Sequence, residues 1–231
     1  MAEPQGGAAR PERTWDLEGV PLGPIQTNCY VLSQGGHALV VDPGGSGAAL
    51  AGHLSDEGLV VDLIVATHGH GDHVGGVAAL KRATGAPFAM SAADADAARH
   101  AAQDPVLGIA YDDDAPAPDR LLAEGDEVAL GSWRLRVLET PGHTPGGIVL
   151  AGSLGDDSIA FVGDTLFAGS VGRCDLPGGS ASDLLASVRR LARELPEGCT
   201  VLPGHGPVTT MATELRSNPY LGPMGASYLG L

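Results

Sequence analysis

Basic residues are scarce in this sequence of 231 residues. It contains 13 Lys and Arg against 28 Asp and Glu, which gives a formal net charge of −15 at pH 7, and Lys81 is its single lysine. A protein that grips a nucleic-acid backbone or lies on an anionic membrane needs a basic face. We therefore expect no nucleic acid and no membrane as a partner. A site that holds metal cations could still attract a small anionic substrate.

Cysteines and long apolar runs are also rare. Cys29, Cys174 and Cys199 are too few and too scattered for a disulfide framework or a zinc finger, so a reducing compartment is predicted. No apolar run approaches the roughly 18 residues of a membrane span, and the N-terminus has no signal-peptide pattern. These absences predict a cytoplasmic protein. Aromatic residues make up only 4% of the chain, which predicts a core of aliphatic side chains.

The chain does contain short aliphatic runs that alternate with helical patterns, as is typical of an α/β protein. We expect a single domain over residues 14–231, preceded by a flexible polar arm over residues 1–13. The segment 104–120, with three consecutive aspartates, is expected to be an exposed connection. The predicted strands are 27–32, 37–42, 60–67, 87–91, 127–130, 133–140, 147–152, 158–164 and 200–204. The predicted helices are 46–58, 74–84, 91–102, 180–194 and 209–218.

The motif THGHGDH combines three histidines and an aspartate in seven consecutive positions. It follows a predicted buried strand and precedes a predicted helix, and its glycines allow a tight backbone path. Imidazole nitrogens and carboxylate oxygens are ligands that zinc accepts. In this loop His68 and His70 can converge on one ion, whereas Asp72 and His73 can face another. A helix-capping role is the alternative for Asp72.

Three further candidate ligands follow predicted strands. PGHTPGG contains His143, GDT contains Asp164 and LPGHGP contains His205, each beside glycine or proline. One histidine in a turn would indicate little, because such a residue is usually structural or solvated. Together with THGHGDH, however, these motifs place five of the eight histidines at four strand ends, which predicts a shared metal centre. The remaining three are expected to be ordinary surface residues: His37, His53 and His100.

These motifs resemble the metallo-β-lactamase-fold superfamily, and within it the short members of the glyoxalase II-like hydrolases. The resemblance spans roughly residues 20–220. It is carried by THGHGDH, PGHTPGG, FVGDTLF and LPGHGP, with NCY, VVDPGG, GDTLFAGSVGRCDLPGG and RSNPYLG in support. It implies a single-domain αββα sandwich whose metals lie at the strand ends between the two sheets.

The resemblance also implies a ligand set and a mechanism. Two divalent cations about 3.5–4 Å apart can share one hydroxide at neutral pH, and this hydroxide would attack the carbonyl of a small thioester. Asp72 and Asp164 are the implied catalytic residues. Zinc is the expected metal, with iron and manganese as alternatives. The implied ligands are His68, His70 and His143 for the first metal and Asp72, His73 and His205 for the second, with Asp164 bridging both.

Substrate recognition is less clearly specified. Glyoxalase II proper grips glutathione partly through a C-terminal helical domain, and the short stretch after His205 does not contain one. Glutathione is therefore a doubtful carrier, and we expect another small thiol or a different acyl carrier. Arg173 in GRCD could hold a substrate carboxylate or form a structural ion pair with Asp175. The adjacent Cys174 is expected to be an inert thiol.

Two other functions stay open at this point. A persulfide dioxygenase of the same superfamily shares the GRxD loop and would use one iron, held by His68, His143 and Asp164. The GDTLFAGS and NCY segments fit the hydrolase better. A non-catalytic metal-binding protein is the other alternative, although structural zinc sites are usually closed and rich in cysteine. A dinuclear metallo-hydrolase is therefore the leading prediction.

Overall fold

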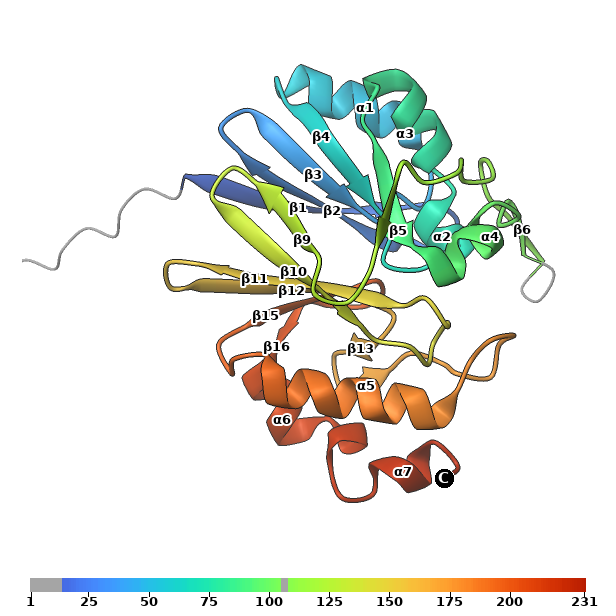
Figure 1. Cartoon of the computed structure of the whole chain (residues 1–231), viewed down its shortest axis with the longest axis vertical. Coiled ribbons are helices and arrows are strands. Elements are labelled where there is room, and N and C mark those ends of the chain that lie inside the picture. Colours follow the sequence, from blue (N-terminus) through green and yellow to red (C-terminus); the bar gives the residue numbers. More distant parts are fainter. Residues whose placement is uncertain (1–13, 105–107) are drawn as a thin grey trace, which may run out of the picture.

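Two β-sheets pack face to face, and helices cover the outer face of each (Figure 1). The computed structural model describes residues 14–104 and 108–231, so the expected arm over residues 1–13 lies outside the described residues. In spatial order the first sheet contains β1 (Trp15–Leu22), β2 (Thr27–Gln34), β3 (His37–Val41), β4 (Val60–Val65), β5 (Phe88–Ser91) and β8 (Arg120–Leu122). The second contains β16 (Thr209–Thr210), β15 (Thr200–Pro203), β12 (Asp157–Gly163), β11 (Ile148–Leu154), β10 (Trp133–Glu139) and β9 (Glu127–Leu130).

Helices α1 (Gly47–Asp56) and α3 (Val77–Thr84) lie over the first sheet, and helices α5 (Ala181–Glu194) and α6 (Met211–Ser217) lie over the second (Figure 1). Short strand pairs occur outside the sheets: β6 (Gln103–Asp104) with β7 (Ile109–Ala110), and β13 (Leu166–Phe167) with β14 (Ser170–Val171). The helices are α1 (Gly47–Asp56), α2 (Gly71–Val74), α3 (Val77–Thr84), α4 (Ala95–Ala98), α5 (Ala181–Glu194), α6 (Met211–Ser217) and α7 (Gly225–Tyr228), with 3₁₀ turns at Ala92–Asp94 and Pro219–Leu221.

Apolar side chains fill three layers, one between the sheets and one under each helical layer. Neighbouring residues of a strand point to opposite faces of its sheet. In β2, Leu32 faces the layer between the sheets, whereas Val31 faces the layer under α1 and α3. Strands buried on both faces are continuous aliphatic runs, which is why the sequence predicted them well. Four of the nine aromatic side chains lie between the sheets, where Trp15 meets Trp133 edge to face at 5.0 Å between ring centroids.

Most predicted elements are confirmed, but two helices differ from the prediction. The predicted helix 74–84 is divided into α2 and α3 at Gly75 and Gly76, which pack against the backbone of the loop after β3. The predicted helix 91–102 is wrong beyond Ala98, because the carbonyl of Ala98 accepts the amide of Ala115 and the helix cannot continue. The segment 104–120 is not wholly exposed either, since Tyr111 is buried.

Within residues 14–104 and 108–231, we find no helix that combines the length and the apolar character needed to cross a membrane. The finding agrees with the absence of a long apolar run in the sequence.

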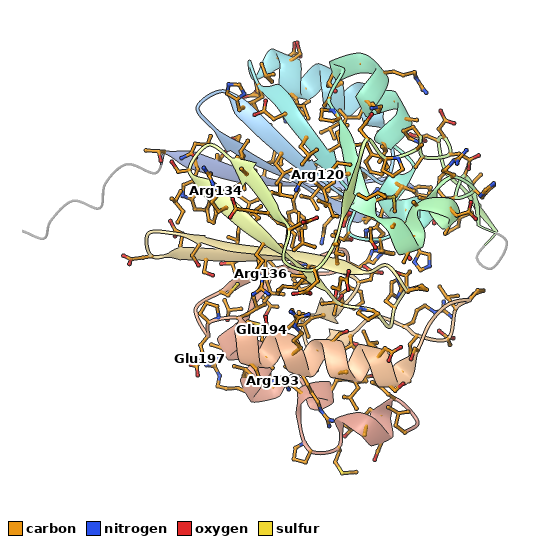
Figure 2. All side chains as sticks on the ribbon, viewed as in Figure 1. Arg120, Arg134, Arg136, Arg193, Glu194 and Glu197 are labelled. Atoms are coloured by element: carbon orange, nitrogen blue, oxygen red, sulfur yellow. The ribbon has the colours of Figure 1, made fainter. Side chains whose placement is uncertain are left out.

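A charged network ties the turn before β9 to α5. Glu124 accepts hydrogen bonds from both terminal nitrogens of Arg190, at 2.7 and 2.9 Å, and one from Arg136 at 3.1 Å. The hydrogen bonds from Arg190 are the main cause that lowers the pKa of Glu124 from 4.5 to about 2. Arg190 also contacts Glu194 of α5, which lies beside Arg136 on the same side of the molecule (Figure 2).

Replacing Glu124 with glutamine is expected to lower the free energy of unfolding at pH 7 by about 1 kcal/mol, a modest value because solvent screens this partly exposed group. The carboxylate stabilises the folded state fully above the unfolded pKa near 4.5, and this stabilisation is lost as the pH falls toward 2. Denaturant titrations of both proteins should therefore show a difference that shrinks between pH 5 and pH 2. A difference that stays constant over this range would contradict the assignment.

Candidate metal centre

Four strand ends meet at one edge of the sandwich and carry the seven candidate ligands. The loop after β4 carries His68 and His70, and the short helix α2 that follows carries Asp72 and His73. The other three candidates follow β10, β12 and β15 of the second sheet: His143, Asp164 and His205. The structure thus brings all seven side chains together from both sheets. The predicted surface histidines lie apart from them and are exposed: His37, His53 and His100.

The first group contains three histidines. Nδ1 of His70 lies 3.0 Å from Nε2 of His68 and 2.9 Å from Nε2 of His143. Zinc–nitrogen bonds of 2.0–2.1 Å at a tetrahedral angle place ligand nitrogens about 3.3 Å apart, close to these separations. Burial is the main cause that lowers the pKa of His68, and it lowers the pKa of His70 to about 4. Both rings are therefore neutral at pH 7, which is the form that binds a metal ion.

The second group contains Asp72, His73 and His205. Oδ2 of Asp72 lies 3.0 Å from Nε2 of His205 and 3.3 Å from Nε2 of His73. Asp164 lies between the two groups: its Oδ1 is 3.3 Å from Nε2 of His73, and its Oδ2 is 3.5 Å from Nε2 of His143. The carboxylate of Asp164 therefore faces both groups at once.

Two buried polar atoms between the groups indicate whether metal ions fit here. Nε2 of His73 and Oδ1 of Asp164 are buried and have no hydrogen-bond partner. Buried polar atoms are nearly always hydrogen-bonded, so atoms of this kind require another role. Both belong to a set of ligand atoms that lie within 4.8 Å of one another together with His68. The histidine and aspartate groups are thus suitable for binding two metal ions.

Contacts outside the seven residues orient the rings. Nδ1 of His143 lies 2.7 Å from the carbonyl oxygen of Arg173, so Nε2 is the nitrogen that faces the other histidines. Nδ1 of His73 lies 3.0 Å from Oδ2 of Asp42, a carboxylate that also accepts both the amide and the hydroxyl of Thr67 at 2.7 Å. The hydroxyl of Thr27 donates to Oδ2 of Asp72 at 3.0 Å.

Asp42 and Thr27 were not among the residues predicted for this site. Asp42 follows β3 in VVDPGG, so a carboxylate at a strand end was the signal that could have found it. Thr27 offered no comparable signal, because only the approach of β2 to α2 brings its hydroxyl to Asp72. Arg173, predicted as a substrate ligand or an ion-pair partner, forms two hydrogen bonds with Asp175 at 2.7 and 2.8 Å.

The comparison with known proteins identifies the family. A model described as the metallo-beta-lactamase superfamily matches residues 22–205. The chain belongs to the metallo-β-lactamase superfamily. Membership confirms the predicted αββα sandwich as a single domain, and it places the chain among metallo-hydrolases.

Individual relatives within the superfamily cover almost the whole chain. A "Hydroxyacylglutathione hydrolase GloC" from Haemophilus influenzae is 32% identical over 217 residues, which are 89% of this chain and 98% of the relative. The crystal structure of TTHA1623 in a di-iron-bound form has a TM-score of 0.78 and 39% identity, covering 88% of this chain and all of that one. The BLEG-1 B3 metallo-beta-lactamase has a TM-score of 0.76 and 35% identity, covering 89% and 99%.

Replacing Gly204 with alanine is expected to weaken metal binding 10–100-fold, because the added Cβ would collide with Oδ1 of Asp164 and lie 2.5 Å from Cε1 of His73. Gly198→Ala is the matched control, since a Cβ there meets nothing within 4 Å. Zinc bound per chain, measured after dialysis against a chelator, should fall in the first variant and stay unchanged in the second. Equal zinc retention in both would show that Asp164 and His73 can move aside.

Proposed function

We propose that this chain is a dinuclear metal-dependent hydrolase that cleaves a small thioester. The observation that carries the proposal is the position of Asp164, whose carboxylate lies within 3.5 Å of ligand nitrogens from both groups. A single ion held by His68, His143 and Asp164 would leave the second group without a metal. The similarity to a protein named as a hydroxyacylglutathione hydrolase supports the thioester as the substrate class.

The proposed ligand assignment follows the two groups. Bound there, two divalent ions would supply an activated hydrolytic water and a Lewis acid for the carbonyl oxygen. Zinc is our first choice because of the nitrogen-rich donor set, and iron is the alternative because a similar protein was solved in a di-iron form. The first ion would be held by His68, His70 and His143, the second by Asp72, His73 and His205, and both by Asp164.

The carboxylates of Asp72 and Asp164 would act directly on the reactants. Burial alone would raise the pKa of Asp72, but without a metal the charge of His73 and the hydrogen bond from His205 outweigh burial and hold that pKa well below its usual range. A bound cation would favour the ionised carboxylate in the same way, in place of the charge on His73. Asp72 is therefore ionised at neutral pH and can accept a hydrogen bond from the attacking water. The hydroxyl of Thr27 donates a hydrogen bond to Oδ2 of Asp72 and thereby fixes the orientation of the carboxylate. Asp164 would align the same water from the other side.

For the acyl carrier we propose a small thiol that bears a carboxylate. Arg173 is the proposed contact for a carboxylate of this thiol, because its guanidinium stays about half exposed while it is paired with Asp175. A substrate carboxylate would then compete with Asp175 for the same donors. We also propose a cytoplasmic location, which the three free cysteines favour.

The decisive experiment compares metal-loaded and metal-depleted wild-type protein on a panel of a thioester, a lactone, a β-lactam and a persulfide. We expect about two metal ions per chain, thioester cleavage that chelation abolishes, and recovery of activity on adding Zn²⁺. A protein that holds one iron and consumes oxygen with the persulfide would instead be a dioxygenase. Hydrolysis of none of the substrates by the loaded protein would favour a non-catalytic metal-binding role.

A further inference from the structure

A buried carboxylate outside the ligand set joins the two loops that carry the first group of histidines. Asp94 lies in the 3₁₀ turn after β5, and its residue is only 2% exposed. Its Oδ2 accepts the backbone amide of Gly69 at 3.0 Å, and its Oδ1 accepts the amide of Gly146 at 2.7 Å. Gly69 stands between His68 and His70, and Gly146 follows His143 by three positions.

The two glycines allow this close approach. A Cβ at Gly146 would lie 2.6 Å from both Cγ and Oδ1 of Asp94, and a Cβ at Gly69 would lie 2.8 Å from the carbonyl oxygen of Asp94. Any larger residue would push the loops away from the carboxylate. Each oxygen of the Asp94 side chain accepts one amide, whereas asparagine has a single side-chain oxygen, so asparagine cannot reproduce both hydrogen bonds.

Ser91 and Asp94 have the spacing of a capping box, which would place Asp94 in the first turn of a helix. The structure corrects this in part: Ser91 does cap the turn, with its hydroxyl accepting the amide of Ala93 at 3.3 Å. The carboxylate of Asp94 instead reaches across to Gly69 and Gly146, which belong to the two different halves of the sandwich.

This contact bears on the geometry of the first group. Nδ1 of His70 lies within 3.0 Å of Nε2 of both His68 and His143, although His143 comes from the second sheet. A displacement of one loop against the other would separate His143 from His70. The second group is held by other contacts, from Thr27 and Asp42, so it does not depend on Asp94 in the same way.

We propose that Asp94 is a positioning residue that fixes the loop of His68 and His70 against the loop of His143, and thereby sets the metal affinity of this group without contacting the metal. The inference rests on the proposed function in one respect only, the assignment of these three histidines as ligands. It makes no use of the substrate. Partners that orient ligands in this manner typically change metal affinity 10–100-fold when they are replaced.

The test measures Zn²⁺ affinity by competition with a chromophoric chelator in the full chain, without substrate. Asp94→Asn is expected to weaken one of the two zinc sites at least tenfold and to leave the other unchanged. Imidazole ¹H–¹⁵N spectra should show that the weakened zinc site is the one formed by His68, His70 and His143. Asp96→Asn, an exposed carboxylate next to the same turn, removes an equal charge and should leave both sites unchanged.

Unchanged zinc affinity in Asp94→Asn would overturn the proposal, and so would an equal loss at both sites. If the variant does not fold, amide hydrogen exchange in the wild-type protein tests the proposal instead. The amides of Gly69 and Gly146 should be strongly protected, because both donate to Asp94. Exchange at the rate of an exposed turn would refute the positioning role of Asp94. A wild-type protein that binds two zinc ions but cleaves no thioester would contradict the proposed function and leave this inference intact.

Discussion

Replacing Asp164 with alanine is expected to lower the rate of hydrolysis by at least 10³-fold, which corresponds to about 4 kcal/mol of transition-state stabilisation. The reason is its position between the two groups, where one oxygen lies near His73 and the other near His143 and His205. Alanine removes both contacts and leaves a gap where the carboxylate would join the two ions. The expected metal content therefore falls from two ions per chain to one or fewer, as measured by elemental analysis.

Two control variants separate the contributions to this effect. Asp164→Asn keeps the shape and one carbonyl oxygen, so its metal content and activity should lie between those of the wild type and Asp164→Ala. Asp62→Ala removes an exposed carboxylate from β4 and should change neither quantity. If Asp164→Ala cleaved the substrates at the wild-type rate, the bridging role would be wrong.

Much of the candidate site was accessible from the sequence because its residues occupy a recognisable local context. THGHGDH stands after a buried strand, and His143, Asp164 and His205 each follow another strand beside glycine or proline. The strand order of the two sheets brings the ends of these strands together at one edge of the sandwich. A local pattern of ligand residues after several strands therefore predicts that those residues meet in the folded protein. The gathering of all seven side chains follows from the strand order of the two sheets.

The residues that support the site were not accessible in this way. Asp42, Thr27 and Asp94 act through contacts between segments 25 to 52 positions apart, and nothing in their local sequence identifies the partner. Ser91 and Asp94 even have the spacing of a capping box, yet the helical segment that follows ends at Ala98 and not at the predicted Ala102. Tertiary hydrogen bonds to Gly69 and Gly146 prevailed over that local preference.

The edge strand β1 shows the same limit for the fold. Its residues are WDLEGVPL, and glycine and proline within this run are unfavourable for a strand. Proline is tolerated at the edge of a sheet, and β1 is an edge strand that pairs only with β2 among the described strands. Its strand conformation follows from this pairing and not from its own sequence pattern.

A second buried carboxylate, Glu214 of α6, holds the hairpin of β13 and β14 that follows Asp164. Glu214 accepts the amide of Gly169 at 2.8 Å, the hydroxyl of Thr209 at 2.7 Å and the side-chain amide of Asn218 at 2.8 Å. Asn218 in turn donates to the carbonyl oxygen of Ser170 at 3.0 Å. These contacts give the late motif RSNPYLG a structural role, because it anchors the segment that leads to Arg173.

Replacing Glu214 with alanine is therefore expected to lower the free energy of unfolding by about 3 kcal/mol, since three hydrogen bonds to a buried carboxylate are lost. Denaturant unfolding should show this loss, whereas Glu197→Ala, an exposed residue just beyond α5 (Figure 2), should unfold like the wild type. The substitution should also affect the metal centre, because two residues in or just after the hairpin contact predicted ligands. The carbonyl oxygen of Arg173 lies 2.7 Å from Nδ1 of His143, and the ring of Phe167 meets the ring of His205 edge to face, with 6.1 Å between ring centroids. An unchanged unfolding midpoint in Glu214→Ala would mean that the hairpin is held by its apolar contacts alone.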